Sequence, residues 1–176
     1  MPRRPLFALS ALAATLVTLT APSAVWALEG QLSASVRLGA SLGRGPRAGL
    51  GPALELAGGY GLNDAFTLYA AAGYATTFPA APYAPTHRGW ASAGLRYAFD
   101  YLRVVPVISV GLRGDLLASP YDGWLTPSAE LRVGLVWMRA RYRAWELDLG
   151  YAAHFLQREH APDVFSVNIG YHFLRD

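Results

Sequence analysis

The feature that most constrains this chain is an alternation of apolar and polar side chains with a period of two, which begins at Gln31 and continues to Phe173. A period of two puts successive side chains on opposite faces of a β-strand, whereas a helix would give a period of 3.6. The alternation is interrupted by Gly, Pro, Asn and Asp, which favour turns. The pattern therefore predicts an all-β chain, with eight strands near residues 32–42, 50–60, 66–76, 91–99, 104–114, 129–137, 145–153 and 165–173.

One face of each expected strand carries no charge, and the other face is polar or small. The polar face is mostly Gly, Ala and Ser, with charges set among them. These charged residues are Arg37, Glu55, Arg96, Arg113, Asp115, Glu130, Arg132, Glu146 and Asp148. The alternation alone does not say which face lies inside, so a secreted lipocalin-like barrel and a membrane barrel both have to be weighed.

Composition and size favour the membrane barrel. A soluble exterior carries about 25–35% charged residues, whereas this chain has 15% charged and 53% hydrophobic residues. The interior of an eight-stranded barrel is just wide enough for side chains to fill it, so it could not hold most of the apolar ones. We therefore predict an eight-stranded antiparallel up-and-down transmembrane β-barrel with its apolar face outward.

Aromatic residues and connection lengths agree with that orientation. On the apolar face, large aromatics gather beside both sets of turns, as in the aromatic girdles of membrane barrels. The first set is Tyr60, Phe66, Tyr97, Phe99, Trp137, Trp145, Tyr171 and Phe173, and the second is Tyr74, Tyr151 and Phe165. Short turns are expected at 62–64, 100–102 and 138–142, and longer loops at 43–49, 77–89, 116–127 and 154–163. Short turns of such barrels face the periplasm.

The first 27 residues have the layout of a cleaved secretory signal peptide. A basic start with Arg3 and Arg4 precedes an apolar stretch at 6–20, and small or permissive residues at Val25 and Ala27 fit a cleavage site. The apolar stretch is shorter than the roughly 20 residues that span a bilayer as a helix. We expect a signal peptide at 1–27 and one barrel domain at 28–176. The absence of cysteine excludes disulfides, thiolate metal sites and cysteine nucleophiles.

These patterns make the chain similar to a known family, the small eight-stranded outer-membrane barrels typified by the OmpA transmembrane domain and OmpX. The resemblance covers residues 30 to 173 and rests on strand number, alternation, aromatic girdles and the C-terminal run at 165–173. It implies an outer-membrane location in a Gram-negative bacterium. The resemblance is architectural, so it supplies no site residues.

The charges on the expected inner face are the first candidates for function, because a charge in a low-dielectric interior is costly unless it is paired. Arg37 and Glu55 fall at similar heights on neighbouring strands, as do Arg132 and Asp148. The simpler interpretation is a plug of salt bridges that fills the barrel and gives it a structural or surface-interaction role. The alternative is a gate whose ion pairs rearrange to open a narrow pore.

A second alternative is a lipid-modifying hydrolase, because barrels of this size include such enzymes. His154 and Ser166 are expected to point inward near the outer rim, with Glu159 and Asp163 between them in sequence, which permits a Ser-His-acid arrangement. The motif of lipid A deacylase barrels is missing, so we expect no enzyme and no catalytic residues. His154, Glu159, His160 and Asp163 have no regular metal-ligand spacing, so we expect no metal and no cofactor.

The expected partners follow from the membrane location. They are outer-membrane lipid, lipopolysaccharide and the barrel assembly machinery, and the protein is expected to be a monomer. Arg44, Arg47, Arg88 and Arg158 in the outer loops could pair with lipopolysaccharide phosphates. The two basic residues Arg3 and Arg4 leave with the signal peptide, so the formal net charge of +3 falls to +1 and gives no reason to expect nucleic-acid binding.

Overall fold

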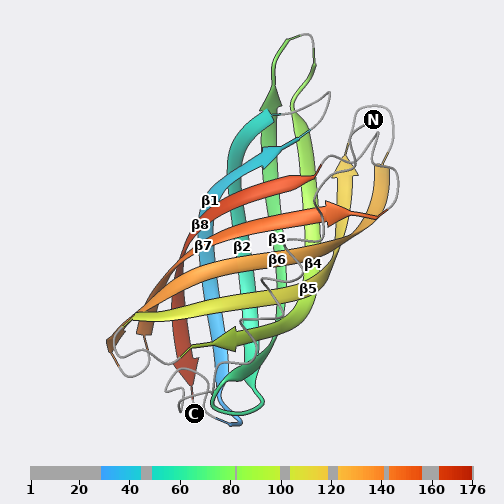
Figure 1. The fold of residues 1–176 in the computed structure, drawn as a ribbon. Coiled ribbons are helices and arrows are strands. Elements are labelled where there is room, and N and C mark those ends of the chain that lie inside the picture. The colour runs from blue at the N-terminus through green and yellow to red at the C-terminus, as the bar shows by residue number, and fades with distance from the viewer. Residues whose placement is uncertain are drawn as a thin grey trace, which may run out of the picture.

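The computed structural model of the protein is an eight-stranded barrel. It describes residues 29–44, 49–81, 83–99, 104–118, 123–140, 143–155 and 163–175. Figure 1 shows the strands wrapping obliquely around a common axis. The strands are β1 (Leu32–Gly43), β2 (Gly49–Gly61), β3 (Phe66–Pro79), β4 (Thr86–Ala98), β5 (Val104–Ala118), β6 (Gly123–Ala140), β7 (Arg143–His154) and β8 (Val164–Arg175). The predicted signal peptide at 1–27 lies outside the described residues.

Each strand pairs antiparallel with its neighbours in sequence, and β8 pairs with β1 to close the sheet. The closure is staggered: residues that lie opposite each other in neighbouring strands, followed from Leu32 once around the barrel, lead to Leu42, ten residues further along β1. A stagger of this size goes with strands tilted by about 35–45° to the barrel axis. The predicted fold class, an eight-stranded antiparallel up-and-down barrel, is confirmed.

The connection between β2 and β3 shows how the sequence sets a short turn. Asn63 Oδ1 accepts hydrogen bonds from the backbone N–H groups of Ala65 at 2.9 Å and Phe66 at 2.8 Å. This is the local side-chain contact that makes Asn favourable in turns. The turn lies where the sequence predicted it.

Two of the expected long loops are shorter than predicted. Residues 86–89 belong to β4, and residues 116–118 and 123–127 belong to β5 and β6. The ladder continues because the alternation continues: Leu116 and Leu125 face each other on the outer surface, while Asp115 and Thr126 stay inside. Pro127 made this segment resemble a loop, yet it occupies an outward position opposite Gly114 within the ladder.

Side chains on the two faces differ sharply in exposure. Arg37 is 2% exposed and the next residue, Leu38, is 63% exposed, while Arg132 and Val133 are 3% and 52% exposed. The charges thus lie in the lumen and the aliphatic side chains cover the outside. The arrangement excludes the lipocalin-like alternative, whose apolar side chains would be inside. In the part of the chain that is described, no helix is long and apolar enough to cross a membrane.

Aromatic rings on the outer surface gather at both ends of the strands. Near the short turns, Tyr97 packs against Phe66 and Phe99 with ring centroids 5.0 and 4.6 Å apart. Near the other end, the rings of Tyr151 and Phe165 are 4.8 Å apart. The apolar band lies between these two girdles, as expected for a strand surface that crosses a bilayer.

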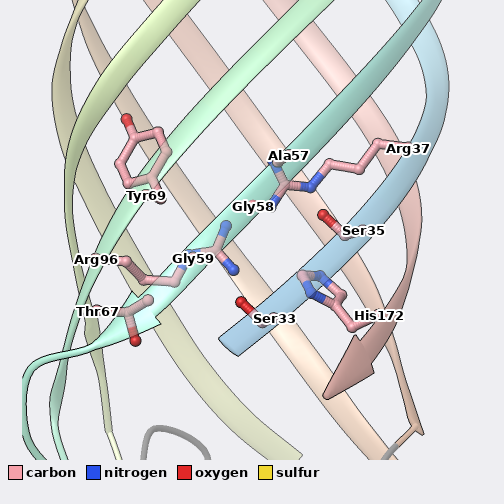
Figure 2. A pocket seen from close by; sticks show the side chains of 10 residues that line it. All are labelled: Ser33, Ser35, Arg37, Ala57, Gly58, Gly59, Thr67, Tyr69, Arg96 and His172. Atoms are coloured by element: carbon pink, nitrogen blue, oxygen red, sulfur yellow. The ribbon is translucent and has the colours of Figure 1, made fainter. Parts of the chain in front are cut away.

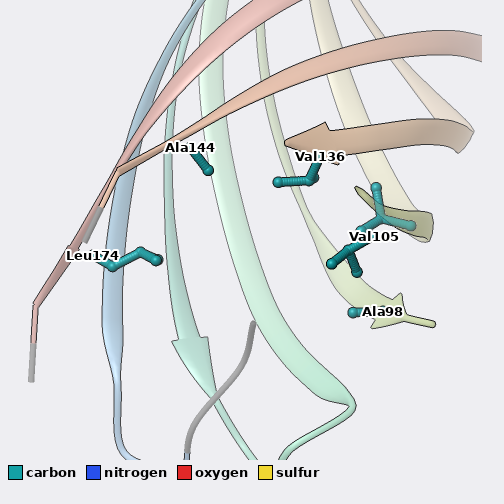
Figure 3. Close-up of a cluster of buried hydrophobic side chains, with 6 residues drawn as sticks. Ala98, Val105, Val136, Ala144 and Leu174 are labelled. Atoms are coloured by element: carbon teal, nitrogen blue, oxygen red, sulfur yellow. The ribbon is translucent and has the colours of Figure 1, made fainter. Parts of the chain in front are cut away.

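The lumen is not polar throughout, which corrects the sequence-based picture of its inner face. At the end of the short turns, a buried apolar cluster projects inward (Figure 3). Its members are Ala98, Val105, Val107, Val136, Ala144 and Leu174. Ala144 and Leu174 lie just outside the expected strands, since β7 begins at Arg143 and β8 continues past Phe173, whereas the other four residues lie within them. The cluster places apolar side chains in the lumen at this end of the barrel.

Candidate functional site: the charged lumen

The structure brings all nine charged residues of the predicted lumen network into one interior and adds Arg88. The set holds five arginines and five carboxylates, each 5% exposed or less. They are Arg37, Arg88, Arg96, Arg113, Arg132, Glu55, Asp115, Glu130, Glu146 and Asp148. The formal charges of these ten side chains cancel.

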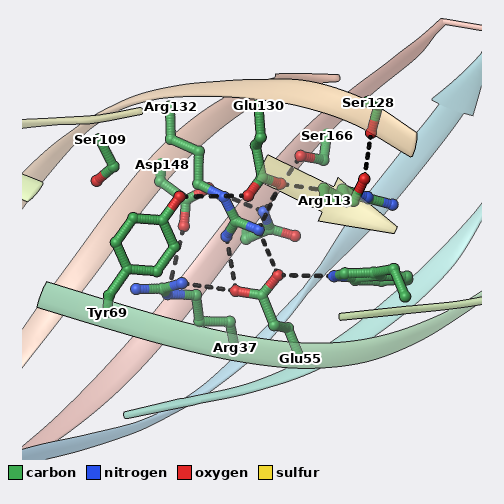
Figure 4. A network of polar contacts seen from close by, with 12 residues as sticks. Arg37, Glu55, Tyr69, Ser109, Arg113, Ser128, Glu130, Arg132, Asp148 and Ser166 are labelled. Carbon is green, nitrogen blue, oxygen red and sulfur yellow. Dashed lines mark hydrogen bonds and ion pairs between the residues drawn. The ribbon is translucent and has the colours of Figure 1, made fainter. Parts of the chain in front are cut away.

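Glu55 on β2 joins two sides of the barrel at the centre of the network (Figure 4). Its Oε1 accepts hydrogen bonds at 2.6 Å from Nη1 of Arg37 and from Nη1 of Arg132. Its Oε2 accepts from Arg132 Nη2 at 2.5 Å and from Trp90 Nε1 at 3.2 Å. Such charge-assisted contacts are stronger than neutral hydrogen bonds. One carboxylate therefore holds together side chains from β1, β4 and β6.

Glu146 on β7 plays the same part nearer the short turns. Its Oε2 accepts from Arg37 Nη2 at 3.0 Å and contacts Nε2 of His172. Its Oε1 lies 3.2 Å from Nη2 of Arg96, whose Nε donates to Ser109. The carboxylate thus connects β1, β4, β7 and β8.

The expected pairing of Arg132 with Asp148 is wrong. Asp148 lies opposite Gly134 in the β6–β7 register, and Arg132 lies opposite Gly150. The Arg132 side chain instead crosses the lumen to Glu55. Asp148 accepts a hydrogen bond from Asn168 at 2.8 Å and lies 3.6 Å from Arg37 Nε.

Toward the loop end, Arg113 extends the network. Its Nη1 lies 3.2 Å from Glu130 and its Nη2 2.7 Å from Asp115. Glu130 is also 2.8 Å from Arg132, so the ion pairs run without a break from Asp115 to Glu146. The Arg113 guanidinium stacks 4.4 Å above the ring of Trp90. The network therefore spans most of the length of the lumen.

Arg88 was expected in an outer loop and lies in the lumen instead. Because β4 begins at Thr86, the alternation seen at Ser92 runs back through Trp90 to Arg88. Its Nη2 donates to Ser41 at 2.5 Å, and its Nε lies 3.5 Å from Asp115. Extending the inward positions of β4 by two further steps would have found it. Of the other predicted loop arginines, Arg44 is exposed, and Arg47 and Arg158 lie outside the described residues.

Solved structures with the same architecture include proteins of the outer membrane. Neisserial surface protein A matches with a TM-score of 0.67 at 12% identity, over 82% of this chain and 99% of that one. OprG from Pseudomonas aeruginosa matches with a TM-score of 0.61 at 10% identity, over 85% and 99%. The outer membrane enzyme PagL matches with a TM-score of 0.54 at 15% identity, over 80% and 98%.

The chain has the architecture of the small eight-stranded outer-membrane barrels. The resemblance to the OmpA and OmpX architecture is thereby confirmed. No protein-family model matches the sequence, and no curated protein matches it by sequence. At these identities the likeness shows the outer-membrane barrel fold alone, so the enzyme activity named for PagL does not transfer.

In this barrel the described hydrolase candidates do not come together. Ser166 lies opposite Gly150, four residues from His154 along β7, which is about 13 Å of strand. His154 Nε2 is 3.3 Å from Asp115, deep in the lumen. Asp163 accepts a hydrogen bond from the Tyr151 hydroxyl. Glu159 and His160 lie outside the described residues, and the described part contains no cluster of three metal-ligating side chains.

Proposed function

We propose that this protein is an outer-membrane barrel with a closed, salt-bridged lumen, and that it has a structural or surface-interaction role. The continuous network from Asp115 to Glu146 carries the proposal, because it fills the interior with paired side chains. The apolar cluster at the turn end supports it. A lumen of eight strands is about wide enough for side chains alone.

The proposal places the protein, after signal-peptide cleavage, as a monomer in contact with outer-membrane lipid and lipopolysaccharide. The barrel assembly machinery would insert it. The exposed aliphatic band and the two aromatic girdles support contact with lipid. Short turns of such barrels face the periplasm. In the proposed orientation the turn between β2 and β3 therefore lies on the periplasmic side, and the β3–β4 hairpin faces the outside of the cell.

We expect the protein to extract with the outer membrane and to show different apparent masses before and after boiling in detergent. A closed barrel has no free edge from which unfolding can start, so it resists detergent until it is heated. Gel electrophoresis of membrane fractions measures this directly. Recovery from the soluble periplasm without detergent would contradict the membrane location.

Wild-type protein in planar bilayers should show little or no steady conductance, because paired side chains block the lumen. Replacing Glu55 by Ala removes the carboxylate shared by Arg37 and Arg132, so we expect more frequent brief openings. Single-channel recordings of both proteins provide the measurement. Steady conductance by the wild type at neutral pH would make the narrow gated pore the better function.

A further inference from the structure

A small cavity lies in the lumen at the end of the short turns. Its wall includes Ser33 and Ser35 of β1, Thr67 and Tyr69 of β3, Arg96 of β4 and His172 of β8. The centre of a water molecule can occupy a volume of about 20 Å³ within it. A single water needs about 10–15 Å³ on this measure, so the space suits one particle of about that size.

The wall contains hydrogen-bond donors and positive charge, and among the described residues no carboxylate is part of it. Figure 2 shows Arg96 and His172 reaching into the cavity from opposite sides. Glu146, which contacts both of them, is not part of the wall. A ligand in this cavity would therefore meet the Arg96 guanidinium and the His172 ring directly.

Two residues with hydroxyl side chains in the wall, Ser35 and Thr67, are buried. Ser35 is 5% exposed and Thr67 is 8% exposed, and neither side chain makes a hydrogen bond to another described residue. Buried polar groups in native proteins are nearly always hydrogen-bonded to protein, water or a ligand. These hydroxyls are therefore available to donate hydrogen bonds to an occupant of the cavity.

The side of the cavity formed by β2 is bare because it consists of Ala57 and Gly59. A Cβ atom at Gly59 would lie 2.6 Å from Ser33 Oγ and 2.9 Å from Thr67 Cγ2, so any larger residue would push these two wall side chains aside. Ser33, Ala57 and Gly59 are half-buried, whereas Arg96 is buried. The cavity is therefore reached from the turn end and closes toward the network.

We propose that this cavity binds a small monovalent anion of the size of chloride. A spherical anion can accept hydrogen bonds from the Arg96 guanidinium and from the Ser35 and Thr67 hydroxyls together. Charge-assisted hydrogen bonds of this kind are strong in a water-poor site. Bulkier anions such as phosphate do not fit a space for one water-sized particle.

Bromide and chloride test the site in two ways. Crystals soaked in sodium bromide should show one anomalous peak within hydrogen-bond distance of Arg96 Nη1 or Nη2 and the Thr67 hydroxyl. In solution, detergent-solubilised protein should broaden the ³⁵Cl resonance of sodium chloride. Losing a hydrogen bond from a charged donor weakens binding by about tenfold and losing one from a neutral donor by about fivefold, so Arg96→Gln and Thr67→Val should weaken chloride binding by these factors.

Ser92→Ala is the matched control, because Ser92 is also a buried lumen hydroxyl but does not line the cavity. It should leave the chloride broadening unchanged. Thr67→Val keeps the shape of the side chain and the ion pairs, so it tests the site even if Arg96→Gln fails to fold. A cavity holding water only, or a bromide peak without chloride broadening in solution, would overturn the proposal. Equal broadening by wild type and Thr67→Val would overturn it as well.

Discussion

Replacing Glu55 by Gln should lower the free energy of unfolding in lipid vesicles by about 3–5 kcal/mol, the cost of breaking a buried ion pair by removing one partner. Both oxygens of Glu55 are engaged, and Arg37 and Arg132 would each lose a contact of 2.6 Å or less. The remaining charges would no longer cancel. Urea titrations of the folded barrel in vesicles measure the difference.

The double variant Glu55→Gln with Arg132→Gln is the informative control. It removes one positive and one negative charge, so the net charge of the lumen is unchanged. Arg37 still contacts Glu146. The loss of unfolding free energy in the double variant should therefore be clearly smaller than the sum of the losses in the two single variants, as expected for residues in one network. Additive losses would show that Glu55 and Arg132 are not energetically coupled.

Replacing Val133 by Arg should destabilise the inserted barrel by about 2–4 kcal/mol, the cost of a lipid-facing Arg at the bilayer midplane. Val133 is 52% exposed on the outer surface. It lies in the aliphatic part of β6, away from Trp137 in the girdle near the short turns. Folding titrations in vesicles provide the measurement.

Val104→Arg is the matched control for this substitution. Val104 also faces outward, but it pairs with Trp137 at the level of the aromatic girdle. The cost of Arg falls to about 0–1 kcal/mol near the interface. A cost for Val133→Arg no larger than that for Val104→Arg would contradict the placement of the bilayer.

The strand pattern was predictable because each side chain faces either lipid or lumen, so one alternation sets both surfaces. Arg37 and Glu55 could be paired in advance since they are direct partners in neighbouring strands. Glu55 and Arg132 could not, because their contact crosses the lumen and depends on the closed barrel and on long flexible side chains. Arg88 was missed since the Pro-rich sequence before it resembled a loop.

The apolar mouth of the lumen was also hidden from sequence reasoning. Val105 and Val136 lie within the expected strands and face inward by alternation, but Ala144 and Leu174, which they join, lie just beyond the expected strand ends, where the boundary of an element is least certain. Leu174 follows the aromatic run that seemed to end the last strand. Only the closed register shows that these side chains meet in one place.

Where β1 pairs with β8, the side chains themselves favour the correct register. Arg37 of β1 lies against Gly170 of β8, where an added Cβ would come within 2.8 Å of Arg37 Cγ, and it reaches Glu146 on β7. A slip of one residue in strand pairing turns every side chain to the other face. Incorrect pairing of β1 with β8 would therefore put the Arg37 guanidinium in lipid and leave the Glu146 carboxylate without this partner. The same ion pairs that block the lumen thus penalise incorrect closure and favour a single way of completing the barrel.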